Sequence, residues 1–271
     1  MTTPFTTLMA QLAQAPDGST LTVTEDWGQG RTLFGGISAA LCVASAQQTI
    51  GEGAPPLRSG QFAFIGPASG PFRLESVVLR RGKSTVFVQA DLHGEAGLAT
   101  RALLTFGAAR QSAIDDTDLA APATVDPDRC SPLHPEGKGP GFVANFEIRP
   151  ADGVAVFSRE ARESAQRPDL LLWARHRDPA AGMGAPALIA LADTPPPAAV
   201  RLMTVSAPIS TMTWMVDILP PPPADASDRG WRLLRSSAEV TREGYSSQAM
   251  TLWDEAGRPL VIGRQNIAVF S

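Results

Sequence analysis

The segment "VLRRGKSTVFVQADLHGEAG" at residues 78–97 has a counterpart much later in the chain, "EVTREGYSSQAMTLWDEAGR" at residues 239–258. A second pair precedes these two segments, with "FAFIGP" at 62–67 matching "MVDILP" at 215–220. Self-similarity within one chain indicates a duplicated structural unit. The sequence therefore predicts two copies of one fold, lying side by side.

The first copy reads as a helix followed by strands. Residues 34–50, "FGGISAALCVASAQQTI", form a Gly-Gly turn that opens a helix with small or apolar residues on most faces, which is typical of a buried helix. Residues 58–107 alternate β-rich segments with Gly and Pro. This pattern predicts an antiparallel sheet that follows one central helix.

The second copy repeats this order. Strands are expected at 142–150 and 170–178, a helix at 187–200, and further strands at 209–223 and 231–270. The fold class predicted from these elements is α+β. Each half is expected to hold a long central helix wrapped by a curled antiparallel sheet, and the two sheets are expected to join.

The predicted domain boundaries follow from a segment that lacks periodicity. Residues 111–140 are rich in Pro, Gly, Asp and Ala and are typical of a linker. They separate an N-terminal domain at 1–110 from a C-terminal domain at 141–271.

Composition and charge exclude several classes of partner. A net charge of −4 disfavours nucleic acid, whose phosphates need a clustered basic surface. No apolar run approaches the roughly 18 residues that a membrane span needs. The first residues show no basic region before an apolar segment, so no signal peptide is predicted and a cytoplasmic location is expected.

Common catalytic motifs are missing from the sequence. There is no G-x-S-x-G motif of serine hydrolases. His93, His134 and His176 are scattered, and Cys42 and Cys130 have no metal-ligand spacing. We therefore expect neither a metal nor a cofactor.

Asp193 is the one acid within the apolar run "ALIALADTPPPAAV" at 187–200. Burying an unpaired charge is costly, so such an acid is a helix-end cap, a salt-bridge partner or a functional group. In an apolar setting its pKa would rise, which makes a carboxylate a better base near neutral pH.

Taken together, these residues resemble the double hot-dog acyl-CoA thioesterases of the acyl-CoA thioesterase II type. The resemblance covers nearly the whole chain. Its carriers, in chain order, are "FGG", "FAFIGP", "LRRGKS", "LADTPPPA", "STMTWMVDIL" and "GRPLVIGRQNIAVF". It implies a tandem hot-dog fold and hydrolysis of acyl-CoA thioesters in fatty acid metabolism.

The resemblance also implies a catalytic group in the second half. An Asp, a Ser or Thr and a Gln hold the attacking water in that family. Carried over, the Asp is Asp193 and the Gln is Gln265. The family's hydroxyl position falls on Pro208, so Ser210 or the neighbouring Thr211 is expected to replace it.

The chemistry of these side chains agrees with that assignment. Hydrolysis needs a base for the water, here Asp193, and hydrogen-bond donors for the oxyanion. The Gln265 amide can accept from the water and donate to it or to the carboxylate. The N–H groups of Gly35 and Gly36, at a helix start, are candidate oxyanion donors in a substrate-binding role.

Two alternatives stay open at this point: a non-catalytic acyl-thioester-binding or scaffold protein, and an enoyl-CoA hydratase or dehydratase on the same fold. The first half is expected to be catalytically silent. Its helix contains no acid, and aligning Gly94 with Gly257 places Ala102 opposite Gln265. A homodimer or larger homo-oligomer is expected, because such assemblies are common in the resembling family.

Overall fold

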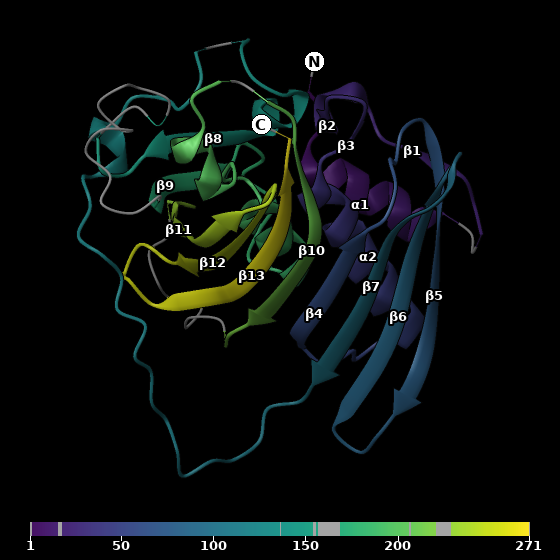
Figure 1. The fold of residues 1–271 in the computed structure, drawn as a ribbon. Coiled ribbons are helices and arrows are strands. Elements are labelled where there is room, and N and C mark those ends of the chain that lie inside the picture. Colours follow the sequence, from purple (N-terminus) through teal and green to yellow (C-terminus); the bar gives the residue numbers. More distant parts are fainter. Residues whose placement is uncertain are drawn as a thin grey trace.

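One long antiparallel sheet runs through both halves of the chain. The computed structural model describes residues 2–270 except 16–17, 136, 154–155, 157–168, 206 and 221–228. Eleven strands pair in the order β1-β5-β6-β7-β4-β10-β13-β12-β11-β9-β8, and every pairing is antiparallel (Figure 1). The order on one side of the β4–β10 junction mirrors the order on the other, as the sequence repeat predicted.

The first half contains two helices and the strands on one side of the β4–β10 junction, from β1 at the edge of the sheet to β4 at the junction. Its elements are α1 (Phe5–Gln14), β1 (Leu21–Thr22), the 3-10 turn η1 (Glu25–Trp27), the short β2 (Gly28–Gln29) and β3 (Thr32–Leu33), α2 (Gly35–Ile50), β4 (Leu57–Phe64), β5 (Pro71–Arg81), β6 (Thr85–Gly94) and β7 (Gly97–Gly107). The helix α2 lies behind β4–β7 in Figure 1 and packs against β5, β6 and β7.

The second half repeats this plan with a shorter helix. Its elements are η2 (Pro127–Arg129), η3 (Gly141–Asn145), β8 (Phe146–Pro150), β9 (Asp169–His176), α4 (Ala185–Ala192), η4 (Ala198–Leu202), β10 (Ile209–Ile218), β11 (Arg232–Arg242), β12 (Tyr245–Trp253) and β13 (Pro259–Val269). The sequence predicted a long helix in each half, whereas α2 has 16 residues and α4 only eight.

The early end of α4 has a local cause. Residues 195–197 are three consecutive prolines, which lack the N–H that a continuing helix needs. The helix predicted over 187–200 therefore stops at Ala192, and the chain resumes as the 3-10 turn η4.

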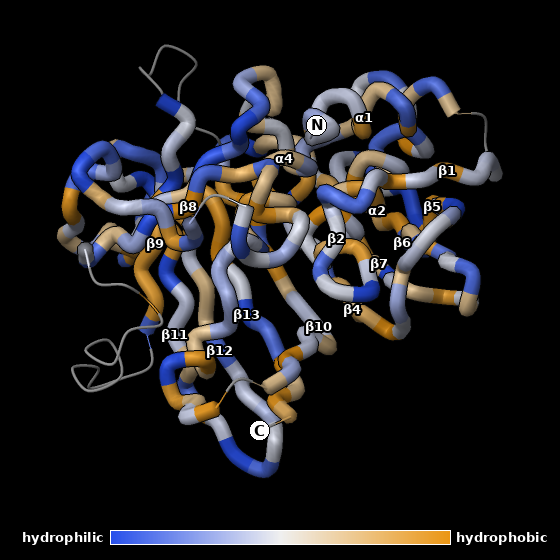
Figure 2. Tube along the Cα trace, turned by 90° about the horizontal axis from the view of Figure 1, so that it is seen from above, coloured by the Kyte–Doolittle hydropathy of each residue, from blue (hydrophilic) through white to orange (hydrophobic). Residues whose placement is uncertain are grey.

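The two helices approach closely at the centre of the core. A Cβ atom on Gly36 of α2 would lie 2.8 Å from the carbonyl oxygen of Ala190 in α4. Glycine at this position is what allows the helix start to touch α4. Figure 2 shows hydrophobic segments along both helices and polar segments at the peripheral loops.

The linker packs along the face of the second half that lies away from α4. The indole N–H groups of Trp253 and Trp173 donate to the carbonyl oxygens of Leu119 and Val125, at 2.7 and 2.8 Å. Cys130 packs into the same apolar cluster as these two tryptophans. The linker therefore covers this outer face, although much of the segment leading into it is exposed.

Among the described residues, no helix combines the length and apolar character needed to cross a membrane.

Candidate functional site

Asp193 lies directly after the last residue of α4, at the C-cap position. The sequence predicted that this acid lies within a helix over 187–200, whereas the structure places it one residue beyond the end of α4. The turn is closed by the N–H of Thr194, which donates to the carbonyl oxygen of Leu191 at 3.1 Å. The carboxylate thus projects from a fixed helix end and not from a mobile loop.

The start of α2, from the first half, faces this carboxylate. The backbone N–H of Gly36 donates a hydrogen bond to Asp193. A Cβ atom on Gly35 would lie 2.9 Å from Asp193 Oδ2 and 3.4 Å from the ring of Phe64. The first half therefore supplies a helix N-terminus, whose partial positive charge favours a nearby carboxylate.

Gln265 binds the same carboxylate from the sheet. Gln265 is 5% exposed and lies on the face of β13 toward α4, and its Nε2 donates to Asp193 Oδ1 at 2.7 Å. These residues are 72 positions apart in the sequence. The structure thus brings together four of the predicted residues: Asp193, Gln265, Gly35 and Gly36.

Gln248 is a further member of this group that sequence reasoning missed. It is fully buried on β12, directly opposite Gln265, and its Nε2 donates to Gln265 Oε1 at 2.8 Å. Its own Oε1 accepts the backbone N–H of Ala198 at 2.9 Å. The available signal was its alternation with Ser246, Met250 and Leu252, which places a polar amide on a buried strand face.

The two hydroxyl candidates do not share a face of the sheet. A bulge between Thr211 and Thr213 changes the alternation on β10. Thr211 pairs with the buried Ile267, so it lies on the same face as Gln265, whereas Ser210 pairs with Ala268 on the other face. Ser210 is exposed. The geometry therefore favours Thr211, although the residue directly opposite Gln265 on β10 is Trp214.

Asp193 has an altered proton affinity. Desolvation by burial raises the pKa of its carboxyl group to about 7, against the hydrogen bonds from Gln265 and Gly36, which lower it. The residue as a whole is only partly buried. It therefore combines access with a pKa close to neutral pH, as a general base requires.

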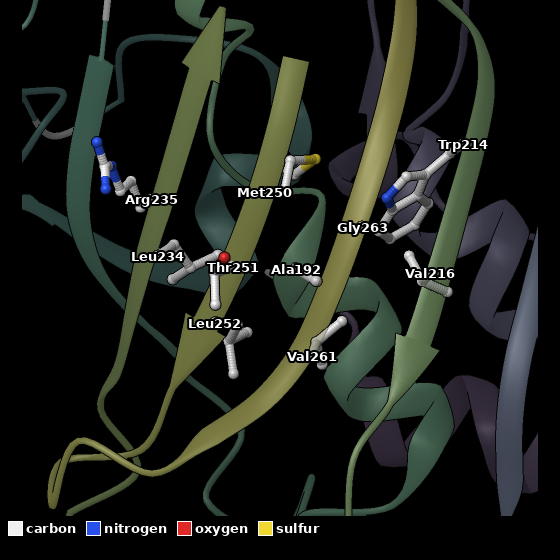
Figure 3. A pocket seen from close by; sticks show the side chains of 10 residues that line it. All are labelled: Ala192, Trp214, Val216, Leu234, Arg235, Met250, Thr251, Leu252, Val261 and Gly263. Atoms are coloured by element: carbon white, nitrogen blue, oxygen red, sulfur yellow. The ribbon is translucent and has the colours of Figure 1, made fainter. Parts of the chain in front are cut away.

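A small apolar cavity lies between the end of α4 and the sheet, and it is lined by Ala192, the residue before Asp193 (Figure 3). Its volume is about 10 Å³, and its walls include Ala192, Trp214, Met250, Val261 and Gly263. In Figure 3 the indole nitrogen of Trp214 lies on the side of the ring near Gly263. This buried nitrogen has no hydrogen-bond partner among the described residues.

A larger cavity of about 430 Å³ lies along α4 next to Ala187 and Leu188, and it contains His176. Nε2 of His176 lies 2.9 Å from the carbonyl oxygen of Ala187, and burial lowers the pKa of its ring. Neither this cavity nor the smaller one is lined by the residues that bind the Asp193 carboxylate, and the smaller one is lined by the residue directly before Asp193.

The family of the chain follows from a comparison with protein-family models. Residues 127–269 match the acyl-CoA thioesterase C-terminal domain, and residues 23–107 match the acyl-CoA thioesterase N-terminal domain. The chain belongs to the acyl-CoA thioesterase family, and the resemblance seen in its sequence is confirmed.

Solved structures support the same fold. A hot-dog protein of unknown function from Alicyclobacillus acidocaldarius is 23% identical, with a TM-score of 0.81 and coverage of 93% of this chain and 92% of that one. Acyl-CoA thioesterase II TesB2 from Mycobacterium marinum is 18% identical, with a TM-score of 0.68 and coverage of 92% and 91%. These similarities show that the fold is of the hot-dog type. No curated protein matched the sequence.

Proposed function

We propose that this protein hydrolyses acyl-CoA thioesters with Asp193 as the general base. The observation that carries the proposal is the environment of this one carboxylate. It has a pKa of about 7, it accepts from Gln265 and Gly36, and it stands beside an apolar cavity in a chain with acyl-CoA thioesterase domains.

The proposed reaction balances without a covalent enzyme intermediate. Asp193 takes a proton from a water while the water oxygen bonds to the thioester carbonyl carbon. The tetrahedral intermediate then collapses, the carbon–sulfur bond breaks, and the coenzyme A sulfur leaves with the proton that Asp193 holds. A base of this kind contributes about 10²- to 10⁴-fold to a rate.

The oxyanion donors need one change from the sequence-based expectation. The N–H of Gly36 already lowers the pKa of the Asp193 carboxyl group, so we assign this donor to the carboxylate and not to the substrate. We assign the oxyanion to the N–H of Gly35, the first of α2, which has no intrahelical acceptor. The second hydrogen of Gln265 Nε2 is the other proposed donor.

The apolar cavity is the proposed site of the acyl group. A volume of about 10 Å³ is close to the space for a single water, so even a short acyl group enters only by displacing side chains, and each added carbon requires more displacement. Short acyl groups are therefore the proposed substrates.

The experiment is a panel of acyl-CoA substrates of increasing chain length, with detection of the free thiol. We expect turnover of the shortest members and a loss of at least about 100-fold in kcat for Asp193→Asn. The absence of thiol release from every member by the folded wild-type protein would rule out the proposed hydrolysis.

A second candidate function is acyl-thioester binding without turnover. The hydrogen bond from Gly36 favours it, because this bond lets Asp193 serve as a cap for α2. In that case titration calorimetry would detect acyl-CoA binding, and Asp193→Asn would leave thiol release at the level without protein.

A further inference from the structure

The hydrogen bonds behind Asp193 form a chain that has only one direction. A backbone N–H donates and cannot accept, so Gln248 must turn its Oε1 toward Ala198. Its Nε2 then faces Gln265, which accepts through Oε1 and must turn its own Nε2 toward Asp193. The backbone donor at one end therefore dictates that the carboxylate at the other end accepts.

Burial prevents either amide from reversing. Gln248 is 0% exposed and Gln265 is 5% exposed. A reversed amide would place two donors or two acceptors opposite each other, with no bulk water beside Gln248 to compensate. A single orientation of Gln265 is therefore maintained.

The pKa of Asp193 depends on this orientation of the Gln265 amide. The interactions that alter the pKa of the carboxyl group are desolvation and the hydrogen bonds of Gln265 from β13 and Gly36 from α2, and no charged side chain among the described residues contributes. A donor favours the ionised carboxylate, whereas a carbonyl oxygen in its place would favour the protonated acid.

We propose that Gln248 is a positioning residue, which holds the Gln265 amide so that Asp193 accepts a hydrogen bond and serves as the base. This proposal rests on the proposed function. It assigns Gln248 no contact with the substrate.

Gln248→Met is the first test, because it keeps the length of the side chain and removes both polar groups. Without its partner the Gln265 amide can turn, and its carbonyl then faces Asp193 in part of the molecules. We expect the acid limb of the kcat/KM pH profile to move up by at least about half a unit. We also expect kcat at pH 7 to fall about tenfold, with KM changed less than threefold.

Gln248→Glu is the second test and reverses the chain. When ionised, its carboxylate accepts both from Ala198 and from Gln265, which then presents its carbonyl oxygen to Asp193; when protonated, it donates to Gln265 as the native amide does. The loss of kcat should therefore grow as pH rises through the pKa of the introduced carboxyl group, and above that pKa it should exceed the loss in Gln248→Met. Because this variant keeps the bond to Ala198, it serves as the test even if Gln248→Met does not fold.

Ser246→Ala is the matched control. Ser246 is buried on the same face of the same strand and bonds Thr241 at 2.9 Å, outside the chain of amides. It should leave the pH profile unchanged. An unchanged kcat and acid limb in a folded Gln248 variant would overturn the positioning role.

The role of Gln248 can also be tested if the protein has no thioesterase activity. If the wild-type protein released no thiol, the Asp193 carboxyl would instead be titrated by carbon NMR. A higher pKa in Gln248→Met would then support the positioning role without catalysis, and an unchanged pKa would refute it.

Discussion

Phe62 of β4 and Trp214 of β10 pair directly at the junction of the two half-sheets, with ring centroids 5.6 Å apart. On either side of them, Thr213 pairs with Ala63 and Met215 with Gln61. This pattern is that of a local two-fold axis between Phe62 and Trp214, so each residue is the structural equivalent of the other. The sequence match of 62–67 with 215–220, which set Phe62 opposite Met215, is therefore wrong by one residue.

The same axis makes Ala102, which has no polar side chain, the structural equivalent of Gln265. Gln265 pairs with Trp214, and Ala102 pairs with Phe62. This register agrees with the alignment made from the sequence, and the silence of the first half remains a prediction. Gln265→Ala should lower kcat by about 100-fold, with no second, independent activity left. A component of the wild-type turnover that survives Gln265→Ala with its kcat and KM unchanged would contradict a single site.

The pH dependence of stability tests the environment of Asp193. Its folded-state pKa of about 7 lies above the ordinary value of 3.8. Between these values the folded state binds more protons than the unfolded state, so this group lowers stability as pH rises. Asp193→Asn lacks this effect, and its Tm minus that of the wild type should increase from pH 4 to pH 8. A constant difference in calorimetric scans would argue against a desolvated carboxylate.

The size of the apolar cavity predicts the preference for acyl chain length. Met250 is 8% exposed and forms part of the cavity wall. Met250→Ala should enlarge the cavity and move the optimum of kcat/KM to longer acyl-CoA substrates. Met215→Ala, on the exposed opposite face of the sheet, is the control with the same deletion. If the wild type, Met250→Ala and Met215→Ala preferred the same chain length, the acyl group would not bind in this cavity.

The close approach of α2 and α4 predicts a strict requirement at Gly36. A Cβ atom there would lie 2.6 Å from the ring of Phe34 and 2.8 Å from Ala190 O. Overpacking of this kind costs about 1–3 kcal/mol, so Gly36→Ala should lower the free energy of unfolding by that amount. Gly184→Ala is the control, because its nearest neighbour would be 3.8 Å away. Equal denaturation midpoints would show that the helices adjust freely.

The oligomeric state also remains a prediction. The outer face of the first half exposes Val77, Phe87 and Leu103, while the linker covers the corresponding face of the second half. We expect a homodimer or larger homo-oligomer that assembles through the open face, and Leu103→Glu should weaken this assembly. Sedimentation velocity at micromolar concentrations measures this, and a monomeric wild-type protein would contradict it.

The sequence predicted what depends on repeats and local patterns. The paired half-sheets, the buried first helix and the meeting of Asp193 with Gln265 follow from the duplication and the resemblance. The face of Thr211 did not, because one bulge in β10 changes the alternation on which the assignment rests. Gln248 was missed because a lone glutamine becomes informative only when the register of β12 against β13 is known.

The way the linker is attached determines what a cut in it would do. Residues 108–118 are exposed, whereas the linker from Leu119 onward is bound to the second half. A proteolytic cut in the exposed part would leave each fragment with its own strands, and the fragments would stay associated through the β4–β10 pairing. Gly36 and Asp193 would then sit on separate polypeptides, so the chain is suited to fragment complementation.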